Sequence, residues 1–344
     1  MKKISIPILL ILSTVLVNCG GLKTLQHSDV QELNLKGKVK TLKSQSYYAK
    51  DSAGYAVKTF KGTGYGDFSY QDVVINLNAS GDILKKIELS RNGEEEERIE
   101  NEYNESAKIT VQQTYNDGDL ASKTEYTYYE NGKLKTKKEK KYAYTDAFYL
   151  TSYQYDNFKN PILITHKEIN QKDTVIISNK KLTNQYNEKG IRTQTYIYWG
   201  EEEIKIKYDR KDNIILSETV KGFENQILPK HTYTYNDQNL LIKESNYYAG
   251  NEFAFANHFT YNKDGLLIEE SSSTELNGKY KKKKEIRYNK LDQIIEQETF
   301  DDKGNLKETA TLMYENDAKG NWIKRTVLIN GKPNSIVERT ITYY

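Results

Sequence analysis

Short stretches of alternating apolar and polar residues follow one another along most of the chain, separated by turn-forming residues. In the stretch from Phe253 to Tyr261, the residues Phe253, Phe255, Phe259 and Tyr261 fall on one face of an extended chain. Smaller or polar residues such as Ala256 and Thr260 fall on the other face. This period of two belongs to β-strands and differs from the helical period of 3.6. We therefore predict β-strands of about 8–10 residues and no long helix after the N-terminal segment.

One phrase recurs between the predicted strands: an aromatic anchor, then Asn or Asp, a turn former four places after the anchor, and aliphatic residues. "YNKDGLL", which begins at Tyr261, is a clear instance. The anchors are Leu77, Tyr103, Tyr129, Tyr155, Tyr186, Tyr208, Tyr235, Tyr261, Tyr288 and Tyr314. Their spacing of about 26 residues indicates a repeat architecture, and the next anchor is expected near residue 340.

The chemistry of each position in the phrase predicts a tight turn. An Asn or Asp side chain can accept a hydrogen bond from the backbone two residues on, and so start the turn. The position four places after the anchor holds Gly, Asn or Asp in most repeats, and these residues tolerate a positive φ. Ala107 and Lys159 stand at this position instead, so we expect irregular turns there.

A second turn is needed midway through each repeat. Candidates are "YNDGD" at Tyr115, "WGEE" at Trp199, "YAGNE" at Tyr248, "ELNGK" at Glu275 and "FDDKGN" at Phe300. Each repeat is then one hairpin, and the fold class is all-β: an elongated, twisted antiparallel meander of about ten hairpins, curled by its own twist. The alternative is disorder, since 29% of residues are charged, but 29 tyrosines argue for an ordered chain. Whether the sheet stays open or closes on itself is left open.

The N-terminus has the features of an export signal. Lys2 and Lys3 precede an apolar stretch from Ile4 to Val17, which is shorter than the roughly 20 residues that a membrane-spanning helix needs. The stretch ends in "LVNC", with Cys19 as the chain's single cysteine, so no intramolecular disulfide is possible. These residues resemble a bacterial lipobox. The resemblance implies that residues 1–18 are removed and that Cys19 is acylated, for example with palmitate.

Residues 19–32 are then a lipidated N-terminus and linker, and residues 33–344 form the repeat domain. An alternative is an export signal that contains an unused thiol. The lipid would attach the chain to a membrane, and the glycines that follow Cys19 favour the outer membrane of a Gram-negative-type bacterium.

The repeat phrase resembles the YD or rearrangement-hotspot (RHS) repeats of bacterial cell-surface proteins. The instances that carry this resemblance are "YDNFKN", "YDRKDN", "YNEKGI", "YNKDGL" and "YENDAKGNW". The opening "LNLKGKVKTLKSQSYY" from Leu33 is similar to the entry segment of lipoproteins built from such repeats. The resemblance implies stacked hairpins exposed at the cell envelope. The period here is longer than usual, and the chain is far shorter than the members whose sheets wrap into a closed shell. A weaker resemblance is to membrane-occupation repeats with a "G-x-x-x-x-Y" pattern.

Few residues suggest a catalytic or metal-binding site. The four histidines, His27, His166, His231 and His258, lack metal-ligand spacing, although His231 and His258 lie one repeat apart. Turn propensity accounts for the acidic pairs Asp117/Asp119 and Asp301/Asp302. We interpret the charge runs Glu94–Glu97, Lys137–Lys141 and Lys281–Lys284 as solvated faces and edge protection, with a site for an anionic partner as the alternative. We predict no catalytic residue, cofactor or metal, and the formal net charge of +3 argues against a nucleic-acid partner.

The interpretation that remains is a membrane-anchored envelope protein with a binding or structural role, whose ligand is a glycan or a protein. Aromatic residues on a rigid sheet suit such contacts. The candidate binding surface is Tyr233, Tyr235, Phe253, Phe255, Phe259 and Tyr261. The alternative is an envelope hydrolase with a carboxylate site in a groove of the curled sheet. The sequence does not determine the ligand's identity, the side of the membrane or the oligomeric state.

Overall fold

The structure is a computed structural model that describes residues 29–62, 68, 72–142, 146–170, 173–199, 202–208, 215–221, 227–248, 252–263, 265, 267–276, 279–301 and 303–344. The predicted signal peptide (1–18) and Cys19 lie outside these residues. The described part of the predicted linker is a four-residue helix, α1 (Asp29–Glu32).

Among these residues, all other regular elements are β-strands. They are β1 (Val39–Ser52), β2 (Tyr55–Lys61), β3 (Asp72–Leu77), β4 (Ile83–Leu89), β5 (Glu95–Tyr103), β6 (Ile109–Asn116), β7 (Asp119–Tyr128), β8 (Leu134–Lys141), β9 (Phe148–Tyr155), β10 (Pro161–Ile169), β11 (Thr174–Tyr186), β12 (Arg192–Trp199), β13 (Glu202–Tyr208), β14 (Ile215–Lys221), β15 (Ile227–Tyr235), β16 (Leu241–Tyr247), β17 (Phe253–Tyr261), β18 (Leu267–Leu276), β19 (Lys279–Tyr288), β20 (Ile294–Phe300), β21 (Leu306–Asn316), β22 (Trp322–Ile329) and β23 (Lys332–Tyr343). The predicted all-β fold is confirmed.

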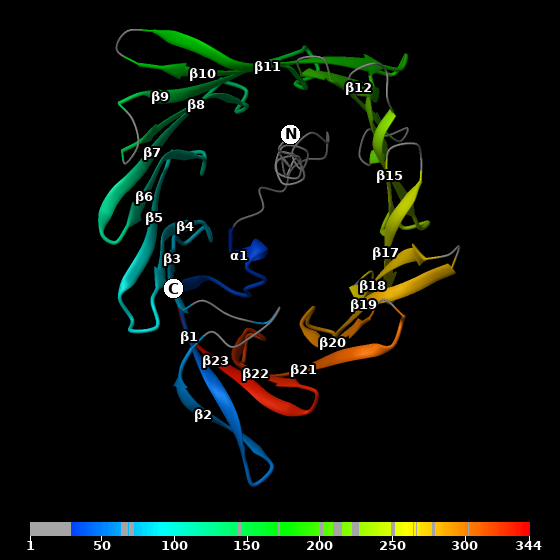
Figure 1. The fold of residues 1–344 in the computed structure, drawn as a ribbon. Coiled ribbons are helices and arrows are strands. Elements are labelled where there is room, and N and C mark those ends of the chain that lie inside the picture. The colour runs from blue at the N-terminus through cyan, green and yellow to red at the C-terminus, as the bar shows by residue number, and fades with distance from the viewer. Residues whose placement is uncertain are drawn as a thin grey trace, which may run out of the picture.

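The strands form one antiparallel meander that curves into a ring (Figure 1). From β3 to β23, each strand pairs with the next one in the chain. Strand β1 joins the two ends, because Leu42 pairs with Ile75 of β3 on one side and with Ile341 of β23 on the other. We call this junction of β1 with β3 and β23 the seam. Strand β2 pairs with β1 alone and forms an arm outside the ring.

The repeat turns follow the predicted chemistry. The Asn104 side chain shows the pattern, because its Oδ1 accepts hydrogen bonds from the backbone N–H groups of Ser106 and Lys108, each at 3.0 Å. The Oδ1 atoms of Asn78, Asp156, Asn187, Asn236, Asn289, Asp301 and Asp317 accept the same pair of bonds. The result is a three-residue loop whose last residue is left-handed, a common hairpin connection.

The expectation of irregular turns at Ala107 and Lys159 is wrong. Both residues adopt a positive φ, 55° and 66°, and their turns contain the same hydrogen bonds as the glycine turns. The bonds from the Asn or Asp side chain and from the backbone fix the loop. The conformation is therefore imposed on a non-glycine residue at a cost of about 1–2 kcal/mol.

Two anchors are displaced from their predicted positions. Tyr128, rather than Tyr129, pairs with Leu134 at the end of its strand, and Tyr129 takes the position that Asn or Asp holds elsewhere. The turn after Tyr314 begins only at Asp317, because two further residues extend strand β21.

Five tyrosines at or next to the anchor positions link their repeat to the one before it. Their hydroxyl groups donate to the backbone oxygen of the residue that opens the outgoing strand of the preceding repeat. The pairs are Tyr103 to Ile83 (2.8 Å), Tyr128 to Ile109 (2.7 Å), Tyr155 to Leu134 (3.0 Å), Tyr261 to Leu241 (2.9 Å) and Tyr314 to Ile294 (2.9 Å). A half-buried tyrosine ring with its hydroxyl bonded in this way contributes both packing and a directional contact.

The apolar core among the described residues is concentrated near the seam. One cluster consists of Leu35, Val39, Leu42, Val73, Ile75 and Leu77, and a second consists of Phe68, Ala310, Leu312 and Val327. Helix α1 lies within the outline of the ring (Figure 1) and is held at the β3–β4 turn, where the Val30 N–H donates to the Gly81 carbonyl at 2.9 Å. The rest of the ring relies on contacts between neighbouring strands, as expected for a stack of repeats.

Candidate binding surfaces

The predicted aromatic surface is divided between two strands. Tyr233 and Tyr235 lie on β15, the phenylalanines and Tyr261 lie on β17, and β16 separates them. Phe255 is exposed whereas Ala256 is buried, as the predicted alternation requires.

Two rings of this surface already have contacts within the sheet. The Tyr261 hydroxyl donates to the Leu241 carbonyl, and Phe253 packs edge-on against Tyr247 with ring centroids 5.9 Å apart. Burial and the nearby Glu270 raise the pKa of Tyr261, so its hydroxyl remains a donor at neutral pH.

The histidines are not brought together in the described residues. His231 pairs with Asn246, which pairs in turn with Phe255, so His231 is level with a position three residues from His258. Burial, followed by the charge of Lys243, lowers the pKa of His258 and keeps it neutral. His27 lies outside the described residues. No group of three His, Cys, Asp or Glu side chains in the described part of the chain could hold a metal ion.

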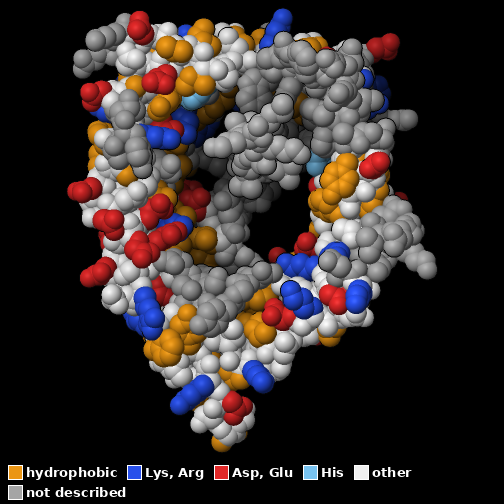
Figure 2. Space-filling view, in the orientation of Figure 1, with side chains coloured by type: hydrophobic (Ala, Val, Ile, Leu, Met, Phe, Trp, Pro, Cys, Tyr) orange, Lys and Arg blue, Asp and Glu red, His pale blue; other side chains and the backbone are white. Residues whose placement is uncertain are grey.

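The charged runs lie among opposite charges. In Figure 2, acidic and basic side chains are neighbours around the ring. Glu139 lies between Lys137 and Lys141, at 3.3 and 3.7 Å, and Glu285 lies between Lys282 and Arg287. A hydrogen bond from Lys282, together with the Arg287 charge, holds the pKa of Glu285 below its usual value. Such a carboxyl group is ionised near neutral pH, so it is not suited to act as a general acid.

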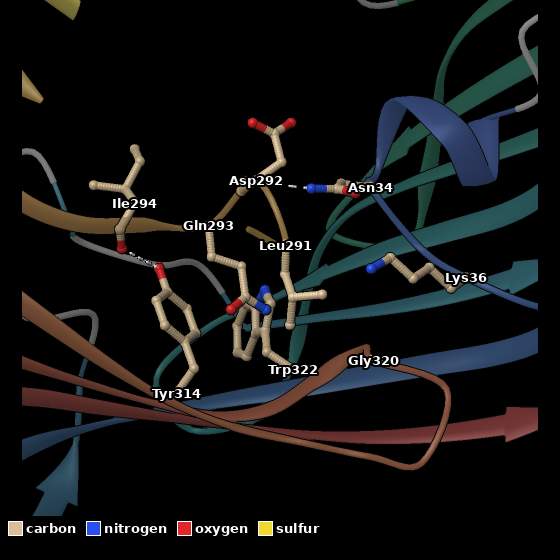
Figure 3. A pocket seen from close by; sticks show the side chains of 9 residues that line it. All are labelled: Asn34, Lys36, Leu291, Asp292, Gln293, Ile294, Tyr314, Gly320 and Trp322. Carbon is tan, nitrogen blue, oxygen red and sulfur yellow. Dashed lines mark hydrogen bonds between the residues drawn. The ribbon is translucent and has the colours of Figure 1, made fainter. Parts of the chain in front are cut away.

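A small pocket lies against the seam, where the segment between α1 and β1 meets β20–β22 (Figure 3). Its volume is about 180 Å³. It is lined by Asn34, Lys36, Leu291, Asp292, Gln293, Ile294, Tyr314, Gly320 and Trp322, and we call it the seam pocket. Leu291, Ile294, Tyr314 and Trp322 supply apolar surface, and Lys36 and Asp292 supply one charge of each sign.

Buried polar contacts hold the walls of the seam pocket in place. Asn321, which is buried, accepts from the Lys36 N–H at 2.7 Å and donates to the Lys36 carbonyl and the Tyr343 hydroxyl, each at 2.8 Å. Gln293 accepts from the Asn289 amide and donates to the Asn316 side chain, again at 2.8 Å each. Because these side chains are already bonded, they fix the shape of the pocket and leave Lys36 and Asp292 as its charged groups.

The Asp317 carboxylate stabilises the segment beside the seam pocket. Burial opposes its ionisation, but hydrogen bonds from the Tyr343 hydroxyl and from the backbone N–H groups of Asn321 and Lys319 outweigh it and hold the pKa of Asp317 below its usual value. Tyr343 lies near residue 340, where the repeat spacing predicts the next anchor. The last repeat is thereby linked to the entry segment.

The seam pocket is not among the sequence-predicted sites. Its two sides come from residues 285 positions apart, such as Lys36 and Asn321, and no local pattern links them. The cue available in the sequence is the departure of the last repeat, "YENDAKGNW", from the common phrase.

Comparisons with known proteins leave the family open. No family model matches the chain, and no curated protein matches it. Solved structures that are similar to it include the following three. A porin-like protein from Bacteroides uniformis has a TM-score of 0.29 and 9% identity, over 89% of this chain and 98% of that one. TcdB2-TccC3 without its hypervariable C-terminal region has a TM-score of 0.32 and 10% identity, over 78% of this chain and 19% of that one.

A porin-like protein from Bacteroides vulgatus has a TM-score of 0.25 and 14% identity, over 76% of this chain and 98% of that one. No helix among the described residues is long and apolar enough to cross a membrane.

Proposed function

We propose that this chain is a bacterial cell-envelope lipoprotein, attached to a membrane through Cys19, whose ring of hairpins serves as a binding scaffold for a glycan. The lipobox-like "LVNC" and the YD/RHS-like repeats support the location. The seam pocket is the observation that carries the binding role.

The lining of the seam pocket favours a sugar unit. Sugars present apolar C–H faces and polar edges, and this pocket combines aromatic and aliphatic walls with Lys36 and Asp292. Its volume of about 180 Å³ suits one small ring rather than a large ligand. A protein ligand is the alternative, and it would contact the exposed strand faces over a much larger area.

The lining of the seam pocket does not suit the hydrolase alternative. Glycoside hydrolysis generally uses a pair of carboxyl groups on either side of the bond. Asp292 is the single carboxylate among the residues that line the seam pocket.

Membrane attachment is tested with Cys19→Ser. We expect the variant to stay unprocessed and to incorporate no radioactive palmitate, because the acylated atom is the cysteine sulfur. The wild-type chain, expressed in parallel, is the positive control. Label in the variant would show that the lipid is attached to a residue other than Cys19.

Ligand binding is tested by screening the chain on a glycan array and measuring the affinity of the best ligand for Lys36→Met and Asp292→Asn. Each change removes a charged hydrogen-bonding group, worth about 1.5–3 kcal/mol, so affinity should fall about tenfold or more. Lys189→Met, an exposed lysine in a distant repeat turn, is the matched control and should bind as wild type. Equal affinity for all three variants would place the ligand outside the seam pocket.

A further inference from the structure

Lys36 is a cation of the seam pocket that has no carboxylate partner. It lines the same pocket as Asp292, yet no ion pair or side-chain hydrogen bond joins the Lys36 ammonium group to any of the described residues. Figure 3 shows the Lys36 side chain extending toward Leu291, whereas the Asp292 carboxylate points away from Trp322. The charge that faces the interior of the pocket is therefore positive.

The turn before β22 sets the position of the Lys36 ammonium group. The lysine side chain passes over Gly320, where a Cβ would lie 3.4 Å from Lys36 Nζ and 3.5 Å from Lys36 Cδ. The missing side chain at Gly320 thus makes room for the lysine. The Asn321 side chain holds the backbone of Lys36 through both its N–H and its carbonyl. Because both ends of the lysine are constrained, less side-chain entropy is lost when an anion binds it.

Two guanidinium groups add positive potential beside Trp322. The guanidinium carbons of Arg339 and Arg325 lie 3.3 Å and 5.6 Å from the centroid of the Trp322 ring. The Nε atoms of both arginines are buried, and salt screens buried charges less than exposed ones. Burial raises the pKa of Tyr314, and the charges of the two arginines oppose this rise, so their potential reaches a second residue of the lining. A ligand against Trp322 therefore lies near these cations as well as Lys36.

We propose that the seam pocket takes an acidic sugar, a hexose ring that carries one carboxylate, with the carboxylate on Lys36 Nζ and an apolar face of the ring against Trp322. This inference rests on the glycan-binding role proposed above and narrows it. One negative charge matches one unpaired ammonium group. A phosphate ester carries nearly two charges and three strong acceptor oxygens, which need more donors than one lysine supplies. Asp292 is exposed at the rim, where a ring hydroxyl can donate to it.

The first test compares three ligands with the same ring: methyl glucoside, methyl glucuronide and the uncharged methyl glucuronamide. Titration calorimetry measures their affinities for the full chain, purified from membranes in detergent. Wild type should bind the glucuronide about tenfold or more tightly than the other two, because only its carboxylate forms a charge-assisted hydrogen bond. Equal affinities would overturn the acidic ligand and leave the glycan role in place. If none of the three binds, the acidic-sugar proposal fails, and the glycan array decides whether the broader glycan role fails with it.

The second test assigns the preference to Lys36. Lys36→Met should remove the preference for the glucuronide over the glucuronamide, and Lys36→Arg should keep most of it because the charge is retained. Lys319→Met is the matched control. Lys319 belongs to the same turn as Gly320, but its ammonium group lies over the Tyr343 ring, 4.4 Å from the centroid, and it does not line the pocket. This variant should keep the preference. A preference that survives Lys36→Met would contradict the proposal.

The third test separates a carboxylate from other anions. Raising the salt concentration from about 0.1 M to about 1 M shortens the Debye length from about 10 Å to about 3 Å. Binding of the glucuronide should weaken accordingly, and binding of the glucoside should not change. Methyl glucoside 6-phosphate should bind more weakly than the glucuronide. Tighter binding of the phosphate ester would identify a different class of anion and overturn the assignment.

Discussion

Lys159 shows that the repeat turn depends on its first residue more than on its fourth. The Oδ1 atom of Asp156 and the backbone hold the loop, and Lys159 accepts a φ of 66° within it. The same holds for Ala107 in the turn that Asn104 begins. At this scale, side-chain hydrogen bonds override a local conformational preference.

Lys159→Gly should therefore stabilise the protein. Glycine adopts the left-handed conformation without the steric cost of a Cβ, so the free energy of unfolding should rise by about 0.5–1 kcal/mol after its greater unfolded-state entropy is subtracted. Denaturant titration measures the change. Lys159→Ala is the control and should leave stability nearly unchanged, since it keeps the Cβ. A gain for Ala equal to that for Gly would assign the effect to the lysine side chain.

At the level of the strands and hairpins, tyrosine side chains join neighbouring hairpins. The sequence repeats tyrosine because the ring spans one repeat and its hydroxyl reaches the backbone of the preceding one, as Tyr103 and Tyr314 do. This explains how a chain with few aliphatic residues keeps its strands in register. The predicted binding surface is affected too, because the Tyr261 hydroxyl is already bonded to a backbone carbonyl within the sheet.

Tyr261→Phe should cost about 0.5–1.5 kcal/mol, because it removes a hydrogen bond to the Leu241 carbonyl and keeps the ring. Chemical unfolding followed by circular dichroism measures the loss. Tyr55→Phe, at the exposed tip of the β1–β2 arm, is the matched control and should have no effect. Equal stability of both variants would mean that the hydroxyl contributes nothing to the link between repeats.

The ring is completed by contacts between distant parts of the chain. Asp72, which is buried at the start of β3, accepts hydrogen bonds from the Ser46 N–H (2.6 Å) and the Ser46 hydroxyl (2.7 Å). Ser46 also pairs with Val337 of β23. The Asp72 carboxylate thus ties β3 to β1, the strand that pairs with β23 on its other side.

Asp72→Ala should destabilise the seam by about 2–3 kcal/mol, because it leaves the buried donors of Ser46 without their acceptor. Hydrogen exchange should show faster opening of β1, β3 and β23 than of β5–β8. Asp72→Asn keeps an acceptor oxygen and should lose less than Asp72→Ala. Uniform acceleration around the ring would show that the seam does not open as a separate unit.

The sequence alone determined the strands, the turns and their period, because hairpin turns are local. An Asn at one position and its backbone partners two and four residues on lie within one phrase, and strand alternation is visible in adjacent residues. The five predicted mid-repeat turns all fall between strands for the same reason. Cys19 and the signal peptide stay predictions, since they lie outside the described residues.

Tertiary structure decided how the meander ends. Closure depends on the twist summed over all strands and on β1 reaching β23, a pairing of residues about 300 positions apart such as Leu42 and Ile341. The seam pocket exists only because of that closure, and the described residues leave 174–179 of β11 without a partner on the β12 side only because two neighbouring hairpins differ in length. Local patterns specify each hairpin, but they do not carry the small differences between hairpins that decide where a sheet meets itself and where it is left uncovered.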